Sequence, residues 1–280
     1  MKLLLALLGG FLCVPGFGQL FYRITPPGGK PSHLIGTMHL VPEDRMRFAP
    51  AVTAALEASE VFVMEINPDI PVSEQLALAG KVIMNPPLQE RIAPERYAAL
   101  RAEAEALGVK GRKFDRYARL KPLFLVPAVV QAALDGTEGV DLVLHKKAVK
   151  RHLPVYGLET AAFQISLLAG IPDDQQLSML DGPDPFGIAD FNRMVDLYFA
   201  ENLAELQRLT AEEMKEFPEL NRKLLEDRNR AWIPEMQRYS TLLSTFYAVG
   251  AAHLPGPEGV LELLEQAGWT VEALPGAFVP

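Results

Sequence analysis

Val61-Phe62-Val63-Met64-Glu65-Ile66 is an almost wholly apolar run that includes β-branched residues. Such a run is typical of a strand that is covered on both faces, as in a parallel sheet. Residues 50–60, immediately before it, include four alanines and a leucine and begin with a proline, which favours a helix. A helix that leads directly into a buried strand indicates an α/β protein.

Further strands are predicted on either side of this unit. Residues 20–24 and 33–36 flank a Pro/Gly turn and are typical of a β-hairpin. Short strands are also predicted at 153–158, 245–250 and 269–274. Much of the remaining chain has a helical pattern, in segments at 94–107, 137–150, 161–169, 190–239 and 256–267.

The order of these elements predicts the fold class. Strands cluster toward the two ends of the chain, and helices dominate its middle. We therefore expect an α/β fold with a central mixed sheet built from both chain ends. Mainly helical insertions are expected around 71–150 and 172–240, within a single domain that spans 19–280.

The first residues have the pattern of a secretory signal peptide. Met1-Lys2 is followed by the apolar run 3–14, and the small residues Gly16 and Gly18 come after it. We predict that residues 1–18 are a signal peptide and that the protein is exported, to the periplasm or outside the cell. The run is shorter than the roughly 20 apolar residues of a membrane span, and we expect no span in the mature chain.

The composition excludes several classes of function. Cys13 is the only cysteine and lies in the predicted signal peptide, so the mature chain would have no thiol nucleophile, zinc–thiolate site or disulfide. The 27 Lys and Arg residues against 35 Asp and Glu give a net charge of −8. This is the wrong sign for a nucleic-acid partner. The oligomeric state has no signature in the sequence.

A repeated short motif carries most of the functional interpretation. Gly36-Thr37-Met38-His39 and Gly250-Ala251-Ala252-His253 both have the pattern Gly-x-x-His, and each follows a predicted strand. Ligands of open α/β sheets bind at the carboxyl ends of the strands. Glycine at such a place lets the backbone turn sharply and lets another group approach closely. We expect the two imidazoles to meet across neighbouring strands.

Acidic residues occupy similar positions. Glu65 lies near the end of a buried strand, where a charge is unfavourable unless it is paired or binds a cation. Glu159 ends another strand and precedes a predicted helix. The structural alternatives are an ion pair with an arginine for Glu65 and a helix-terminus acid for Glu159. Arg228 and Asn229 lie in a predicted helix, where the arginine can face a developing oxyanion, a carboxylate of the site, or solvent.

Two histidines and two glutamates at strand ends form a donor set for a divalent metal with nitrogen and oxygen ligands. We predict metal ligands at His39, His253, Glu65 and Glu159. A metal held in this way lowers the pKa of a bound water and polarises a carbonyl. Glu65 or Glu159 would then handle the proton, and Arg228 would stabilise developing negative charge. The same groups can also act without a metal, with a His or Glu as general base.

These motifs, in this order, resemble those of the TraB/GumN family, which includes the secreted TIKI metalloproteases. The resemblance covers nearly the whole mature chain. Its matching segments are 33–39, 63–65, 156–160, 227–229 and 249–256, with Gly259 and 268–271 near the C-terminus. Ala251-Ala252 departs from the family, whose members often have another glycine or a polar residue before this histidine.

The resemblance implies a fold related to erythromycin esterase and to the haem-binding ChaN proteins. It also implies metal-dependent hydrolysis of a peptide or protein substrate, with manganese or cobalt favoured and zinc as a further option. The functional residues carried over by motif would be His39, Glu65, Glu159 and His253, supported by Arg228 or Asn229. Two alternatives stay open: a non-catalytic module that binds haem or a peptide in the same cleft, and a metal-independent esterase.

Overall fold

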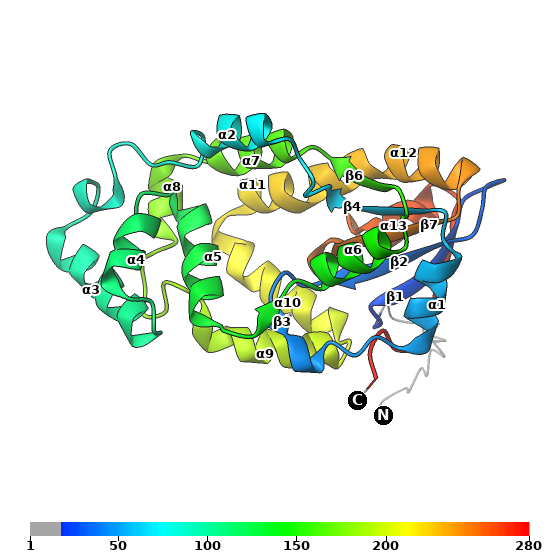
Figure 1. The fold of residues 1–280 in the computed structure, drawn as a ribbon, viewed down its shortest axis with the longest axis horizontal. Coiled ribbons are helices and arrows are strands. Elements are labelled where there is room, and N and C mark those ends of the chain that lie inside the picture. Colours follow the sequence, from blue (N-terminus) through cyan, green and yellow to red (C-terminus); the bar gives the residue numbers. More distant parts are fainter. Residues whose placement is uncertain (1–17, 280) are drawn as a thin grey trace, which may run out of the picture.

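The computed structural model describes residues 18–279, which form an elongated molecule with a β-sheet toward one end and helices toward the other (Figure 1). The sheet has six strands in the order β6-β4-β7-β2-β1-β8. These strands are β1 (Phe21–Thr25), β2 (Ser32–Thr37), β4 (Val61–Ile66), β6 (Val155–Glu159), β7 (Thr245–Gly250) and β8 (Thr270–Ala273). The α/β class and the mixed sheet predicted from the sequence are confirmed.

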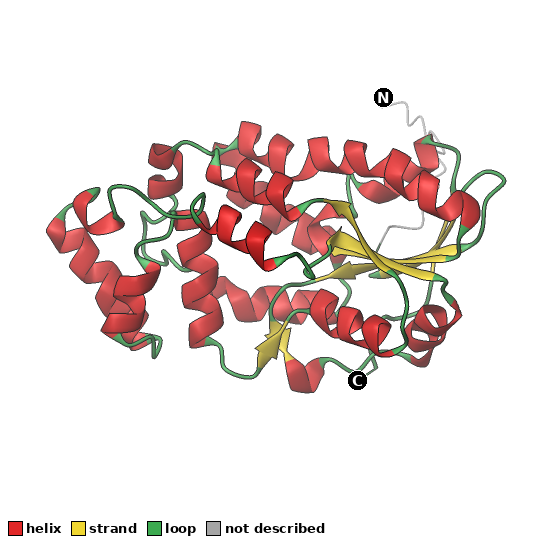
Figure 2. Cartoon of the chain, turned by 45° about the horizontal axis from the view of Figure 1, so that its top comes forward, coloured by secondary structure: helices red, strands yellow, loops and turns green. Residues whose placement is uncertain are grey.

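The strands run in one direction at the centre of the sheet and alternate at one edge. β6, β4, β7 and β2 are parallel, whereas β1 pairs antiparallel with both β2 and β8. The first five residues of β4 and of β7 are buried. Helices lie on both sides of the sheet, which is why these two strands are apolar on both faces (Figure 2).

The register of the parallel strands brings distant parts of the chain together. Thr37, the last residue of β2, lies beside Gly250, the last residue of β7. Ile66 at the end of β4 lies beside Glu159 at the end of β6. The carboxyl ends of the four parallel strands therefore share one edge of the sheet, and this edge faces the helical part of the molecule (Figure 1).

Helices α1, α6, α12 and α13 help to form the hydrophobic core of the sheet, with Val52, Leu144, Trp232 and Leu261 among its buried residues. Tyr198 of α9 and Leu203 of α10 belong to the same core. The six helices are α1 (Pro50–Ala58), α6 (Val140–Lys150), α9 (Ile188–Phe199), α10 (Leu203–Glu213), α12 (Asp227–Leu242) and α13 (Val260–Gln266).

A second hydrophobic core lies in the helical part, and Leu100, Phe114, Leu125, Val129 and Phe186 are buried in it. It is formed mainly by α3 (Pro94–Ala106), α4 (Gly111–Tyr117) and α5 (Pro122–Ala133). Further helices are α2 (Val72–Ala79), α7 (Ala161–Ala169), α8 (Asp173–Ser178) and α11 (Pro218–Asn221). Short helical turns are η1 (Glu43–Arg45), η2 (Leu88–Glu90), η3 (Met214–Glu216), η5 (Ala251–His253) and the π-helix η4 (Arg222–Glu226).

This second core is smaller than the helical insertions expected around 71–150 and 172–240. Its buried residues come from Met84 through Val129 and from Leu180 and Phe186. Helix α6 was expected within the first insertion but packs on the sheet, because Leu144 and its other buried side chains join the sheet core. Helix α12 does the same through Trp232.

Two local expectations differ from the structure. The predicted helix at 137–150 begins only at Val140, because Thr137–Glu138 forms a two-residue strand, β5, against β3 (Val41–Pro42). The predicted helix at 256–267 begins at Val260. Gly256 has a φ of 96°, a left-handed conformation that a right-handed helix does not contain.

The predicted signal peptide at 1–18 lies outside the described residues except for its last position, so it stays a prediction. Within residues 18–279, no helix combines the length and the apolar character that a membrane crossing requires.

Candidate active site

The two Gly-x-x-His motifs lie side by side, because β2 and β7 are neighbouring parallel strands. Neither motif glycine has a positive φ, so the sharp turn expected of them is not their role. Close approach is. A Cβ atom on Gly36 would lie 3.2 Å from the Cα of Ala251 in the second motif, and a Cβ on Gly250 would lie 3.0 Å from Oε1 of Glu65.

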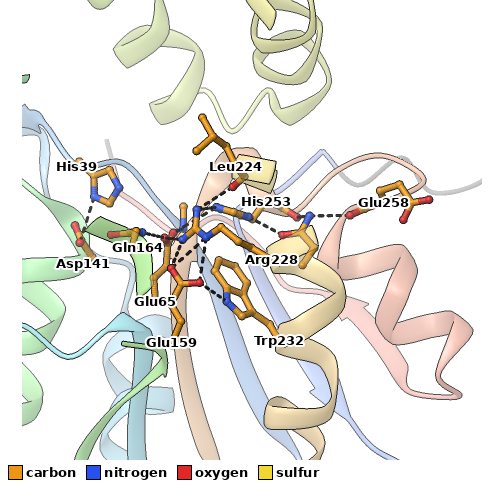
Figure 3. Close-up of polar contacts among 12 residues, drawn as sticks. His39, Glu65, Asp141, Glu159, Gln164, Leu224, Arg228, Trp232, His253 and Glu258 are labelled. Atoms are coloured by element: carbon orange, nitrogen blue, oxygen red, sulfur yellow. Dashed lines mark hydrogen bonds and ion pairs between the residues drawn. The ribbon is translucent and has the colours of Figure 1, made fainter. Parts of the chain in front are cut away.

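Arg228 of helix α12 is at the centre of the site and is buried (Figure 3). Its Nη2 donates to Oε2 of Glu65 at 2.5 Å and to Oε1 of Glu159 at 2.7 Å. Its Nε lies 3.1 Å from both oxygens of Glu159. One guanidinium therefore neutralises charge on two buried carboxylates that come from β4 and β6.

Trp232 lies one helical turn after Arg228 and completes the surroundings of Glu159. Its indole Nε1 donates to Oε2 of Glu159 at 3.2 Å. The guanidinium carbon of Arg228 lies 4.9 Å from the centre of the Trp232 ring, within the range of a cation–π contact. Both oxygens of Glu159 are thus held by donors from one face of α12.

His253 is buried, and both of its ring nitrogens have partners. Nε2 lies 3.2 Å from Nη1 of Arg228, and Nδ1 lies 2.6 Å from Oδ1 of Asn229. A guanidinium can only donate, so Nε2 accepts and Nδ1 carries the proton that it donates to Asn229. Burial, with the Arg228 charge adding to it, lowers the pKa of His253 to about 4, so the imidazole is neutral at pH 7.

Glu65 accepts hydrogen bonds from three directions. The Gly250 N–H donates to Oε1 at 2.7 Å, and Gln164 Nε2 and Arg228 donate to Oε2. Burial alone would raise the pKa of Glu65, but His253, which is protonated at the low pH where Glu65 titrates, and Arg228 favour the carboxylate and bring its pKa down to about 2. Glu65 is therefore ionised across the physiological range of pH.

His39 lies apart from the Arg228 network, and 72% of its side chain is exposed. Its Nδ1 lies 3.3 Å from Oδ2 of Asp141, a residue in the first turn of α6 (Figure 3). The hydrogen bond to Asp141 is the main reason why the pKa of His39 is raised. His39 and Glu65 line the same pocket of about 320 Å³, so the first motif faces solvent where the second is enclosed.

The structure places all the predicted site residues at one edge of the sheet. Glu65, Glu159 and His253, together with Arg228 and Asn229, form one connected network, and His39 lies beside it across the pocket. Among the side chains that the structure describes, no three His, Cys, Asp or Glu groups are arranged closely enough to hold a metal ion as they stand. The roles predicted for these residues stay predictions.

The donors near His253 have the right chemistry for a metal, but a cation is already among them. Oε1 of Glu65 lies 3.8 Å from Nε2 of His253, and imidazole nitrogen with carboxylate oxygen suits manganese, cobalt or zinc. The lone pair of Nε2, however, accepts from Arg228. A metal would have to compete with the guanidinium for this nitrogen.

Sequence reasoning missed three residues that contact the site. Trp232 could have been found from its spacing, because residues four positions apart lie on the same face of a helix and Arg228 was already a candidate. Asp141 was hidden as an acid in the first turn of a helix, a common structural position. Gln164 has no signal in the sequence that distinguishes it from a surface residue.

A π-helix precedes Arg228 in the chain. Residues Arg222–Glu226 form η4, which continues directly into α12 at Asp227. The carbonyl of Leu224, inside this π-helix, accepts a hydrogen bond of 2.9 Å from Nη1 of Arg228. The wide turn therefore supplies one more contact that holds the guanidinium in place. Such turns occur frequently at functional sites.

The fold and the site together define an α/β protein with a buried network of histidine, glutamate and arginine at the carboxyl ends of its parallel strands. The model of the TraB/PrgY/gumN family matches residues 20–273. The chain belongs to the TraB/PrgY/gumN family, as its motifs indicated.

Curated relatives add little about activity. The chain is 29% identical to the uncharacterized protein YbaP of Shigella flexneri over 167 residues, which are 56% of this chain and 59% of that protein. The YbaP protein of Escherichia coli K12 is 28% identical with the same coverage. The matched part of the chain thus spans about three fifths of these relatives. No solved structure matches the chain, so the likeness to erythromycin esterase and ChaN stays a prediction.

Proposed function

We propose that this protein is an exported, metal-dependent hydrolase that acts on peptides. The observation that carries the proposal is the convergence of His39, Glu65 and His253 from three adjacent parallel strands at one edge of the sheet, beside a pocket. Imidazole and carboxylate are ligands that borderline divalent ions accept, with manganese or cobalt favoured over zinc. When bound, such an ion lowers the pKa of a coordinated water and polarises a carbonyl.

The residues around these donors have distinct parts in the proposal. Glu65 is ionised and can accept a proton from the attacking water. Arg228 carries a fixed positive charge and can stabilise negative charge that develops on the substrate oxygen. Both oxygens of Glu159 accept from Arg228 and Trp232, which favours a part in orienting Arg228 over the metal ligation predicted for it.

Asn229 and Asp141 would orient the two histidines. Asn229 accepts from Nδ1 of His253, which leaves Nε2 as the nitrogen that can bind a cation. Asp141 pairs with Nδ1 of His39 in the same way. A carboxylate or amide that fixes the ring of a ligating histidine is a common feature of metal sites.

The test uses the full-length protein stripped of metal with a chelator and then loaded with Mn²⁺, Co²⁺ or Zn²⁺. We expect hydrolysis of a mixed peptide library, followed by mass spectrometry, only after loading. His39→Ala and His253→Ala should each abolish bound metal in elemental analysis and abolish hydrolysis. His145→Ala is the matched control, because His145 contacts Asp69 rather than the site. Full hydrolysis in the presence of chelator would show that the activity does not require a metal.

One observation favours a second candidate, the metal-independent esterase. The guanidinium of Arg228 already lies among Glu65, Glu159 and His253, where a cation would bind. Hydrolysis would then depend on an imidazole or carboxylate as general base and on Arg228 for charge. Chelator-resistant cleavage of small esters, lost in Arg228→Lys, would support this candidate.

The haem-binding alternative has a direct test of its own. Haem iron needs a histidine nitrogen that is free to ligate it. Nε2 of His253 accepts from Arg228, so haem iron, like any other metal, would have to compete with the guanidinium for this nitrogen. An absorption spectrum with added haem that lacks a Soret band would reject the alternative.

A further inference from the structure

Two residues that line the pocket beside His39 each have a buried oxygen atom without a hydrogen-bond partner. The two atoms are Oγ1 of Thr37 and Oδ1 of Asp141, and both residues line the pocket of about 320 Å³. Thr37, at the end of β2, has an exposed fraction of only 3%. Buried polar atoms in folded proteins nearly always have a partner, because leaving one unpaired is unfavourable. These two atoms therefore indicate a ligand that donates hydrogen bonds.

The lining of the pocket narrows the chemistry of that ligand. Glu65 and Asp141 are its two acids, and each has a basic partner, Arg228 for Glu65 and His39 for Asp141. Two acceptors require two N–H groups, which a secondary amide cannot supply but a primary amine with three can.

Apolar residues make up much of the remaining wall, among them Leu40, Met64, Ile66 and Leu142. A site with a few convergent polar groups in an apolar wall is the usual form of a small-ligand pocket. The ligand therefore combines an amino group with a compact apolar group.

We propose that this pocket binds the free amino group and the apolar side chain of a substrate's first residue, with Asp141 and Thr37 as the acceptors of the amine. The inference rests on the proposed peptide hydrolase, because the pocket adjoins Glu65 and His39. It assigns to that enzyme a preference for peptides with an unblocked, apolar amino-terminal residue.

The test is ligand-observed NMR on the full-length, metal-free protein in chelator. Three probes are compared: L-leucinamide, N-acetyl-L-leucinamide and 4-methylpentanamide, which lacks the amino group. We expect L-leucinamide to bind at least fivefold more tightly than the other two. Thr37→Val and Asp141→Asn should each reduce this ratio to below twofold. Asp174→Asn, which changes an exposed acid of α8, should leave the ratio unchanged.

Two outcomes would overturn the inference. Equal binding of the three probes would show that the pocket does not recognise an amine, and the partner of the two oxygens would then be ordered water. Binding of L-leucinamide that is unaffected by Thr37→Val and by Asp141→Asn would place the amine elsewhere. Since no metal is present, a failure of the metal-dependent hydrolase leaves this measurement intact, and the reverse also holds.

Discussion

The two Gly-x-x-His motifs have the same local sequence and the same position after a parallel strand, yet their histidines differ. His253 is enclosed by α12, and both ring nitrogens are bonded to Arg228 and Asn229. His39 is mostly exposed and contacts Asp141 at the rim of a pocket. The pKa of His253 is lowered, whereas that of His39 is raised.

The difference shows that the motif determines the position of the imidazole, whereas the facing helix determines its hydrogen bonds and its protonation. Helix α12 fixes His253 as a neutral, oriented ring that accepts at Nε2. Helix α6 contributes a single carboxylate to His39 and leaves the ring open to the pocket. One motif is therefore the ordered half of the site, and the other is the half that is open to the pocket.

The largest effect is expected from removing the cation of the ordered half. Arg228→Ala leaves Glu65 and Glu159 buried without a counter-charge and should lower the free energy of unfolding by about 3–5 kcal/mol. Urea denaturation at pH 7 measures this. Arg230→Ala, two positions on, removes only surface ion pairs to Asp227 and Glu258 and should change it by less than 1 kcal/mol. Equal losses would contradict the central place of Arg228.

The two histidines should also respond to pH in opposite directions. The pKa of His253 falls from 6.5 to about 4 on folding, so between these pH values the unfolded chain binds a proton that the folded chain does not. Acidification from pH 6.5 to 4 therefore lowers the free energy of unfolding, by about 3 kcal/mol in total. Glu65, whose pKa is also lowered, extends the loss at lower pH, from 4.5 toward 2. The raised pKa of His39 instead stabilises the protein below pH 6.5, and that contribution is lost as the pH rises above it.

Urea denaturation of the metal-free protein from pH 3 to 9 tests these signs. His253→Gln should flatten the slope between pH 6.5 and 4, and His39→Gln should flatten the slope on the alkaline side. A slope between pH 6.5 and 4 that stays the same in His253→Gln would assign the acid loss to other groups.

At neutral pH, replacing His253 and replacing His39 should have different but smaller effects on the stability of the protein. His253→Ala removes the partner of Asn229 and a ring that packs 4.4 Å from Trp232, centroid to centroid, and should reduce stability by about 2 kcal/mol. His39→Ala changes an exposed side chain and should reduce it by less than 1 kcal/mol. Thermal unfolding of both variants makes the comparison, and a larger loss for His39→Ala would reverse the assignment of the two halves.

The smallest effect concerns the backbone of the first motif. The buried Tyr198 hydroxyl donates to the carbonyl of Gly36 at 2.8 Å. Tyr198→Phe should cost about 1 kcal/mol, because this carbonyl loses a partner. Tyr156→Phe on the exposed surface of β6 is the control and should have no measurable effect. If the two variants are equally stable, α9 does not help to hold the first motif.

Much of the sheet could be predicted because its strands are marked by local pattern. Val61–Ile66 was found at its observed bounds, since a wholly apolar run of that length has few other uses. Thr137–Glu138 could not be found, because two residues have no periodicity and their pairing with β3 is a long-range contact. Helix α6 was expected within the first helical insertion but packs on the sheet, since its apolar face does not reveal which core it meets.

The candidate site was predictable at its histidines and acids but not in its connections. The strand-end positions of His39, Glu65, Glu159 and His253 are visible in the sequence. That one arginine would hold both glutamates and a histidine nitrogen depends on how α12 packs across the sheet. Asp141 and Thr37 emerge as a pair only when α6 and β2 are brought to one pocket.

The π-helix Arg222–Glu226 makes the site sensitive to the length of the chain before it. Each residue turns an α-helix by about 100°, and five residues of the wider π-helix turn the chain about as far as four α-helical residues, so loss of one residue lets the stretch close to an α-helix with the faces on either side still aligned. With α12 anchored on the sheet by Trp232 and Met236, the change would fall on Leu224 and the segment before it. Single-residue deletions in this partly exposed stretch should therefore leave α12 in place but remove the contact between the Leu224 carbonyl and Arg228.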